Sequence, residues 1–329
     1  MREFSLAENF AIIALNAQES TRLTNSKKVS LRCLAAAAIL EIFLDNRLTN
    51  KEDSLIFKKE DLNSLNFHQQ SVLKALFGKN ETLSEALPIF LAKVVKLSKR
   101  ALEAVEEAYA FTLIREGAME EIPALINCDL EFITSGISVK EYRSNGEIFT
   151  RLTEGLRAEI LEEGPLTDET ISMLWLLRES GSLYDLFTKE ELKHVATRVY
   201  ELLTNSSLGK LILPIDIHKT VETAVKNFLK IKKEMMSTPS GTGLGYVFPI
   251  IERSQFIFID TEEYFPNNKQ RLHNVIDRLK KNGHNVTVIR EGNIPLIKID
   301  NILYQAMPHA KNYRIPVHGV RLLKYPLSL

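Results

Sequence analysis

The feature that most constrains the fold of this chain is the segment from Leu34 to Leu44, which reads LAAAAILEIFL. Four consecutive alanines stand in a continuous apolar stretch, and Glu41 is its one charged residue. A helix that is apolar on all sides is buried, and small side chains let neighbouring helices approach it closely. The segment therefore predicts a helical bundle built around this helix.

End signals and helical periodicity predict further helices over residues 1–236. Ser5 with Glu8, and Thr188 with Glu191, form capping-box patterns. Pro88 suits the first turn of a long helix that Gly117 would end. A short hairpin is expected after the alanine-rich helix. The other predicted helices cover Ser30–Asn46, Thr167–Arg178 and the chain from Asp216 on, and irregular or strand-like segments are expected at Leu130–Ile133 and Gly146–Phe149.

The composition changes at residues 237–245, STPSGTGLG, which is typical of a flexible linker. Beyond it, short apolar runs with strand periodicity surround one amphipathic helix at Asn267–Asn282. The predicted strands are Gln255–Asp260, Asn285–Arg290, Ile294–Ile299, Ile302–Met307 and Gly319–Lys324. The fold class predicted is mainly α: a helical bundle domain with short β-hairpins over 1–236, the linker, and a small α/β module over 246–329.

Charge, cysteine content and motifs narrow the function classes. Lys and Arg together number 42, as do Asp and Glu, so no overall positive field attracts nucleic acid. Cys33 and Cys128 lie far apart and suggest neither a disulfide nor a metal site, and no zinc or phosphate-loop motif predicts a cofactor. The apolar run Phe10–Leu15 is short for a signal peptide, and no stretch reaches the length of a membrane span. These features predict a cytoplasmic protein with at most peripheral membrane contact.

Several segments resemble the Golgi phosphoprotein 3 family. Ser5–Leu15 is similar to the opening helix of that family, and Leu34–Leu48 matches its small-residue helix without gaps. Leu174–Leu203 resembles its late helix pair, and Leu113–Gly117 fits its L-x-x-x-G helix end. The resemblance covers about residues 3–235. It implies a helical fold and a non-enzymatic protein that binds membrane surfaces, since members of the family bind phosphatidylinositol 4-phosphate.

The headgroup-binding residues of that family are replaced in this chain. Carried over in register, the family's aromatic residue falls on Ser26 and its three arginines fall on Ala35, Glu103 and Glu106. Two carboxylates at these positions would repel a phosphate. An anionic ligand must therefore be recognised by other residues.

Basic residues beside these positions are the candidate anion-binding or lipid-binding site. They are Lys27, Lys28 and Arg32 around the start of the alanine-rich helix, and Lys99 and Arg100 in the long helix. Each cation near an anionic membrane contributes about 1 kcal/mol, so the group predicts weak peripheral attachment to an anionic lipid headgroup. A purely solvated polar face, and an adaptor that binds a protein partner without lipid, are the alternatives. Assembly of identical copies is left open.

The C-terminal module suggests a function of a different class, an enzymatic one. Asp260 ends a predicted strand, and Lys298 and Asp300 lie on a later one. Acidic residues and a lysine at neighbouring strand ends can hold Mg²⁺ and a water for phosphodiester cleavage. A metal-dependent nuclease-like or hydrolytic activity is therefore the enzymatic alternative, beside the commoner role of such acids in turns.

Overall fold

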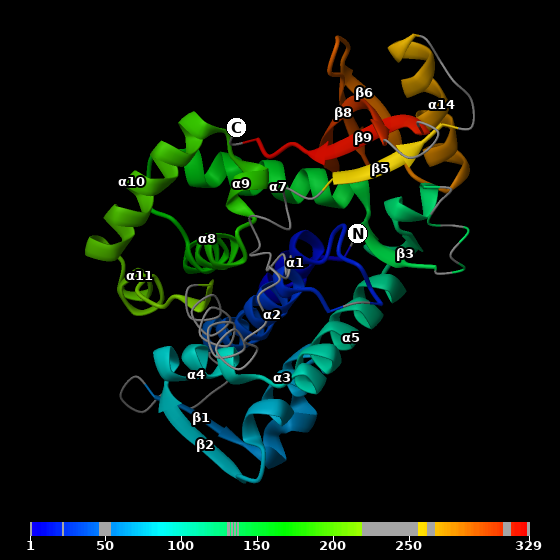
Figure 1. Cartoon of the computed structure of the whole chain (residues 1–329). Helices are drawn as coiled ribbons and strands as arrows, with labels where there is room; N and C mark the ends of the chain where they lie inside the picture. The colour runs from blue at the N-terminus through cyan, green and yellow to red at the C-terminus, as the bar shows by residue number, and fades with distance from the viewer. Residues whose placement is uncertain are drawn as a thin grey trace, which may run out of the picture.

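The computed structural model describes residues 2–21, 23–45, 54–129, 138–218, 256–261, 267–311 and 317–327, and residues 132, 134 and 136. Within these ranges the protein is mainly helical, with two two-stranded sheets and a five-stranded sheet near the C-terminus (Figure 1). This confirms the predicted fold class of a mainly α protein with a small α/β module. In the same residues no helix combines the length and apolar character needed to cross a membrane.

Helix α2 (Asn25–Leu44) lies at the centre of the helical part. It begins earlier than the predicted Ser30, because the Thr24 hydroxyl accepts a hydrogen bond from the Lys27 backbone N–H. Its buried side chains form one hydrophobic core with those of the helices around it. The helices packed against it are α1 (Leu6–Ala14), α3 (Phe67–Phe77), α4 (Leu87–Lys93), α5 (Lys99–Arg115) and α8 (Asp168–Ser180).

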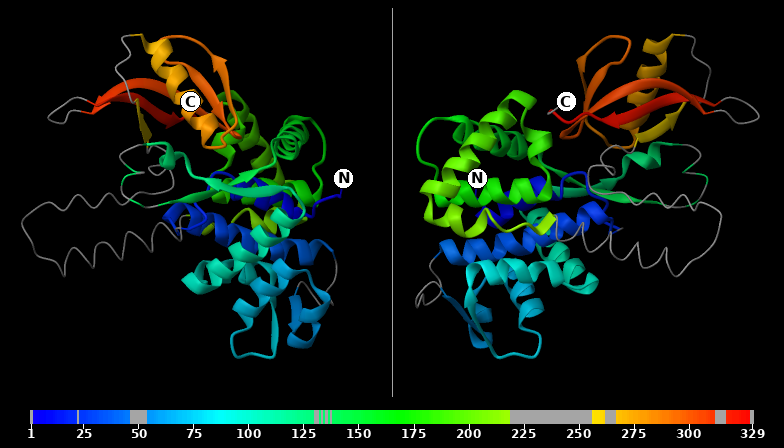
Figure 2. Two further views of the ribbon diagram at one scale, coloured as in Figure 1. Left: turned by 90° about the vertical axis from the view of Figure 1, so that its right-hand side faces the viewer. Right: turned by 60° about the vertical axis from the view of Figure 1, so that its left-hand side comes forward.

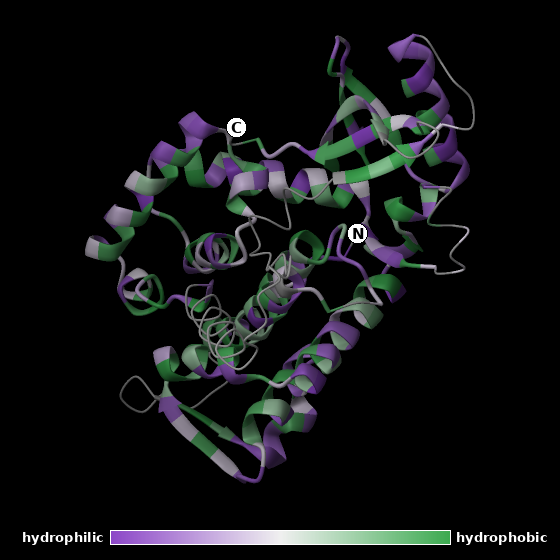
Figure 3. Cartoon of the chain, in the orientation of Figure 1, coloured by the Kyte–Doolittle hydropathy of each residue, from purple (hydrophilic) through white to green (hydrophobic). Residues whose placement is uncertain are grey.

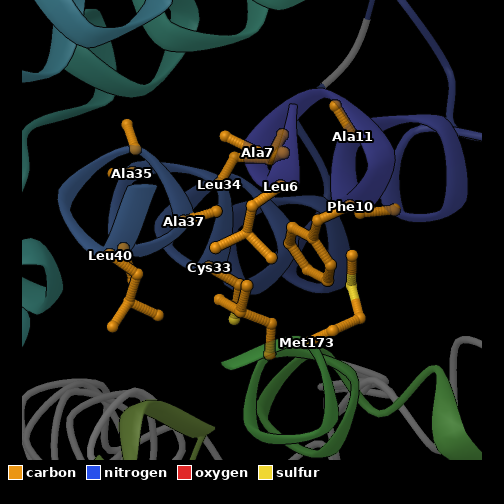
Figure 4. Packing of buried hydrophobic residues seen from close by; sticks show 14 of the residues in the cluster. Leu6, Ala7, Phe10, Ala11, Cys33, Leu34, Ala35, Ala37, Leu40 and Met173 are labelled. Carbon is orange, nitrogen blue, oxygen red and sulfur yellow. The ribbon is translucent and has the colours of Figure 1, made fainter. Parts of the chain in front are cut away.

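The four alanines at residues 35–38 explain how α2 takes so many neighbours. All four are fully buried. Figure 4 shows α1, with Ala7 and Phe10, beside α2, and α8, with Met173, facing both helices. A methyl side chain keeps the distance between packed helices small. The predicted central position of the alanine-rich helix is therefore confirmed.

A buried carboxylate connects three of these helices. Glu41 of α2 accepts hydrogen bonds from the backbone N–H of Ala7 on α1 and from the Gln69 amide on α3. It also contacts Nε2 of His68 on α3 at 3.2 Å. Burial raises the pKa of Glu41, but the interactions with His68, together with hydrogen bonds from Ser5 and the Ala7 N–H, outweigh burial, so the net pKa is lowered. The side chain is held as a carboxylate that joins α1, α2 and α3.

The single helix predicted from Pro88 to Glu116 is wrong, because α4 and α5 are separate helices. Leu97 is extended between them. Ser98 then starts α5, and its hydroxyl accepts a hydrogen bond from a backbone N–H in the first turn. A capping side chain of this kind favours a new helix start over continuation of the old one.

One further local expectation is also wrong. Gly146–Phe149 is not strand-like but begins α7 (Gly146–Leu161), because the Asn145 side chain caps two backbone N–H groups there. The first arm of the short hairpin expected after the alanine-rich helix, and its polar turn at residues 50–53, lie outside the described residues. The chain after that turn forms β1 (Ser54–Lys58), which pairs with β2 (Thr82–Ala86) after α3.

The later helices follow the predicted end signals. Both capping boxes, at Ser5 and Thr188, are present. The indole of Trp175 in α8 donates to the Ile215 carbonyl oxygen at 3.1 Å. Ile217 and His218 are helical, at the start of the helix predicted from Asp216. The rest of that helix and the linker lie outside the described residues. The remaining elements here are η1 (Lys59–Ser64), η2 (Val94–Lys96), α9 (Leu183–Leu186), α10 (Lys189–Asn205) and α11 (Ser207–Ile212).

The C-terminal sheet is fully antiparallel, with strand order β5-β9-β8-β7-β6. Helix α14 (Asn268–Lys281) packs on one face. Figure 2 shows the sheet and α14 at the opposite end of the molecule from β1 and β2. Hydrophilic residues dominate the visible side of α14 (Figure 3). The strands match the predicted ones closely: β5 (Phe256–Asp260), β6 (Val286–Arg290), β7 (Leu296–Ile299), β8 (Ile302–Lys311) and β9 (Val317–Lys324).

The hydrophobic core of this sheet is completed by the helical part. Leu125 and Cys128 of the short helix η3 (Leu125–Cys128) are buried in one cluster with Ile259, Val275 and Leu322. Next to η3, β3 (Met119–Pro123) pairs with β4 (Lys140–Ser144). The division at residues 237–245 stays a prediction, but the two predicted domains share this core.

Gly319 of β9 lies close against the backbone of β5. A Cβ atom there would lie 2.3 Å from the Ile259 carbonyl oxygen and 2.8 Å from the Asp260 Cα, both backbone atoms. Gly319→Ala is expected to lower the free energy of unfolding by about 2–3 kcal/mol, because β5 must move. The same change at Gly155, a helical position with open space around it, is expected to stabilise by up to about 1 kcal/mol. Differential scanning calorimetry of the two variants checks the opposite signs.

Candidate functional site

The structure brings together the two chain segments that carry the predicted anion-binding residues, and Arg32 joins them. Its Nε donates to the Val95 carbonyl oxygen at 3.0 Å, and its guanidinium also reaches the Leu97 carbonyl oxygen at 3.5 Å. Burial lowers the pKa of Arg32 from its usual value. The α2 helix is thereby fixed beside the start of α5, with half-buried Lys28 one turn away from Arg32.

Three exposed cations stand at the start of α5, and we call them the α5 basic cluster: Lys96, Lys99 and Arg100. Lys99 lies 3.6 Å from Glu103, an exposed pair that contributes little energy. Within the described part of the chain, Lys96 and Arg100 form no side-chain hydrogen bond or ion pair. The first turn of α5 carries no acidic residue, and its N-terminus favours a negative charge. These residues can meet an anion from solution.

Lys27 lies elsewhere, in the interior, and this corrects its predicted place in an exposed basic group. Its side chain is 1% exposed and its ammonium forms an ion pair with Glu106. The Tyr142 hydroxyl donates to the same carboxylate at 3.1 Å. Burial raises the pKa of Glu106, and Lys27 and Tyr142 only partly offset that shift. The ammonium of Lys27 is therefore committed to a buried pair.

The structure places the four positions that the resemblance to the Golgi phosphoprotein 3 family aligns with a headgroup site. Ala35 is buried in the core, and Ser26 is half-buried. Glu103 lies near Lys99, and Glu106 is neutralised by Lys27. The two carboxylates thus have cations of their own, and the positions hold no free cationic group for a phosphate.

The hydrolytic centre predicted at Asp260 and Lys298 is not assembled. Strands β9 and β8 lie between β5 and β7, and the ladder places Lys298 opposite Leu303 but Asp260 level with His309. This separates them by roughly 14 Å across the sheet and roughly 20 Å along it. Asp260 is instead paired with Arg278 of α14 at 2.8 Å. The residues therefore cannot share one metal ion and water.

A second polar region lies where the helical part meets the C-terminal sheet. Arg143 of β4 pairs with Asp300, in the turn between β7 and β8, at 3.0 Å. Asn301 in the same turn donates to the Asn16 side chain at 3.0 Å and to the Ser144 carbonyl oxygen at 2.8 Å. These contacts give the junction of the two parts fixed geometry.

Three titratable side chains meet at this junction: Glu141 of β4, His284 after α14, and Asp300. Nδ1 of His284 lies 2.9 Å from Asp300 Oδ2. Burial raises the pKa of Glu141 to about 7, against the opposing effect of His284 and Lys324. Burial also raises the pKa of Asp300, but hydrogen bonds from His284, the Asn285 N–H and Arg143 outweigh it and lower the net value. We call these three residues the junction cluster.

The junction cluster was not predicted from the sequence, which offered Asp300 with Asp260 and Lys298 as a Mg²⁺ site but pointed to neither Glu141 nor His284. Its members stand at positions 141, 284 and 300, a spacing that matches no local motif. The predicted strands on either side of Asp300 do imply a turn at this residue. In the structure Asp300 lies in the β7–β8 turn with a left-handed backbone φ of 53°, which is unusual for a residue other than glycine.

A cavity of about 220 Å³ lies near this junction between α7, α9 and the sheet. Arg157 and Glu154 from α7, Asp185 from α9, and Lys298 and Lys324 from the sheet line it. Arg157 is already paired with Glu154 and Glu191. Charges of both signs therefore face the cavity, and no single ligand charge is favoured.

The comparisons with known proteins found no match to this chain. No protein-family model matches the chain, and no curated protein or solved structure matches it either. The resemblance of residues 3–235 to the Golgi phosphoprotein 3 family therefore stays a prediction.

Proposed function

We propose that this protein is a non-enzymatic binding protein that attaches peripherally to anionic lipid headgroups through the α5 basic cluster and Lys28. The observation that supports this best is the convergence at Arg32, which fixes the start of α5 beside α2 with three exposed cations. Arg32 acts as a positioning residue, because its guanidinium is bonded to backbone carbonyls.

The proposed attachment is weak and electrostatic. Three cations near an anionic surface contribute about 3 kcal/mol together, which corresponds to roughly a 100-fold increase in partitioning. Such attraction falls steeply as salt screens the charges. The protein is therefore expected to associate reversibly, and the site is open enough to accept any anionic headgroup phosphate.

Vesicle flotation of the full chain tests this proposal. Vesicles of phosphatidylcholine alone are compared with vesicles that also contain phosphatidylserine or phosphatidylinositol 4-phosphate, at low and high salt. We expect binding to the anionic vesicles at low salt only, and at least a 100-fold loss in the variant Lys96→Glu, Lys99→Glu, Arg100→Glu. The matched control reverses three exposed lysines on α10 and α11, Lys189, Lys193 and Lys210, and should retain binding.

Failure of the wild-type chain to float with any vesicle at low salt would reject the lipid proposal. Equal losses in the cluster variant and its control would show a general charge effect and would reject the site.

The alternative of a protein-binding adaptor is favoured by a separate observation. Phe67 and Phe111 are both more than half exposed and touch each other, with ring centroids 6.1 Å apart, and Ile114 is 41% exposed on the same helix as Phe111. Exposed apolar groups of this size mark interaction surfaces. The patch lies roughly 16 Å along α5 from Arg100. Phe111→Ser should therefore leave vesicle binding unchanged if the basic cluster carries it.

A further inference from the structure

We propose that the junction cluster of Glu141, His284 and Asp300 binds one divalent transition-metal ion, with Zn²⁺ as the expected ion. One donor atom of each residue lies within 4.8 Å of those of the other two. Donors that are each 2.0–2.2 Å from a tetrahedral zinc ion lie about 3.4 Å apart. The 2.9 Å between His284 Nδ1 and Asp300 Oδ2 is close to that spacing, so a small shift of the two side chains would admit the ion.

The burial of His284 and its contact with Asp300 make it a suitable donor. The His284 side chain is fully buried, and its Nδ1 faces Asp300 Oδ2. An ion bound to both atoms would take the place of the proton that they share. Nδ1 is therefore the nitrogen that would hold the ion, and a neutral imidazole is a common metal ligand.

The buried carboxylate of Glu141 would also be stabilised by a cation. Asp300 is paired with Arg143, but Glu141 forms no ion pair within 4 Å among the residues described. The Leu125 backbone hydrogen-bonds to Glu141, and the charges of His284 and Lys324 act on it from a greater distance. A buried carboxylate without a direct counter-ion is unfavourable. A divalent ion would supply the missing charge. One imidazole with two carboxylates suits Zn²⁺ or Mn²⁺, whereas Mg²⁺ and Ca²⁺ prefer oxygen donors alone.

The position of the cluster gives the ion a structural role. Glu141 belongs to β4 of the helical part, whereas His284 and Asp300 belong to the C-terminal module. Figure 1 shows the β3 region lying directly beside the end of the molecule that carries the sheet and α14. An ion held by all three side chains would therefore lock the two parts together. This role is independent of the proposed lipid attachment.

Zinc binding by the full-length protein tests the proposal. Protein treated with chelator and then freed of it is titrated with Zn²⁺ in competition with a chromophoric chelator. We expect one equivalent to bind with a dissociation constant below about 1 μM, and a rise in the thermal midpoint of about 2–5 °C. Asp300→Asn should weaken binding at least 10-fold. It preserves the left-handed turn, because asparagine adopts that conformation readily.

Two variants identify the site. His284→Ala is expected to weaken Zn²⁺ binding at least 100-fold, whereas His273→Ala should not, although exposed His273 with Asp277 is the kind of surface pair that binds zinc adventitiously. Circular dichroism establishes that each variant is folded. If His284→Ala does not fold, the proposal is tested by the number of Zn²⁺ ions that the wild type binds and by the loss of Zn²⁺ affinity in Asp300→Asn.

Wild-type protein that binds no Zn²⁺ tighter than micromolar would overturn the proposal. Binding that survives Asp300→Asn and His284→Ala but is lost in His273→Ala would also overturn it. Vesicle flotation of Asp300→Asn should match that of the wild type, so failure of the metal site and failure of the lipid site give different results.

Discussion

Replacing Glu41 by alanine is expected to lower the free energy of unfolding by about 3–5 kcal/mol. The change leaves the Ala7 N–H, His68 and Gln69 buried without their acceptor, and each such group costs about 1–3 kcal/mol. This is a large share of the total stability of an ordinary domain. Urea unfolding followed by fluorescence measures it in the helical part, because Trp175 in α8 is the only tryptophan.

The matched control for this change is Glu107→Ala, which removes an exposed carboxylate from α5. It should alter the free energy of unfolding by less than about 0.5 kcal/mol. A similar loss in both variants would contradict the central role of the Glu41 hydrogen bonds.

The same carboxylate gives a pH dependence with a defined sign. The folded-state pKa of Glu41 is lowered, so its contribution is fully present above the unfolded value of about 4.3 and is lost as pH falls through the folded-state pKa. The stability difference between wild type and Glu41→Gln should therefore be constant near neutral pH and shrink in acid. A difference that grew as pH fell would contradict the assigned charge state.

Removing Lys27 alone is expected to have an effect of similar size. Lys27→Met leaves the buried carboxylate of Glu106 with the Tyr142 hydroxyl but no cation, and breaking a buried ion pair in this way typically costs about 3–5 kcal/mol. The double variant Lys27→Met, Glu106→Leu removes both charges and should recover most of that loss, because paired buried charges can often be replaced by apolar groups. Urea unfolding of the two single variants and the double variant gives the coupling energy.

The double variant also bears on function. It should bind anionic vesicles as well as the wild type does, since Lys27 does not reach the surface. A double variant that is as unstable as the worse single one would contradict the pairing. Lost vesicle binding in a stable double variant would instead place the anion site near Lys27 and Glu106, where the predicted resemblance puts a headgroup pocket.

The parts of the fold that depend on local chemistry were predictable. The capping boxes at Ser5 and Thr188 and the strands of the C-terminal sheet appear at their expected positions. The break at Leu97 was missed, although Ser98 offered a capping signal, because the apolar periodicity continues across it. Asn145 is likewise a local capping residue, and it was missed because the residues after it are typical of a strand.

The candidate sites depended on contacts between distant residues and were only partly predictable. Lys99 and Arg100 are exposed, as expected of a surface site. Lys27 has the same chemistry but is buried, because Glu106 and Tyr142 come to it from α5 and β4. No sequence pattern near Lys27 indicates that these residues come together. The contact between Glu141 and His284 was missed for the same reason.

The shared core under the sheet has a consequence for the order in which the protein is made. Leu125 and Cys128 leave the ribosome about 200 residues before β9, the last strand of the sheet that covers them. At roughly 5–20 residues per second, synthesis of the intervening chain takes about 10–40 s. During that interval the helical part must keep η3 in place with its apolar side uncovered. The last strand to be synthesised, β9, therefore covers an apolar surface whose residues were synthesised much earlier.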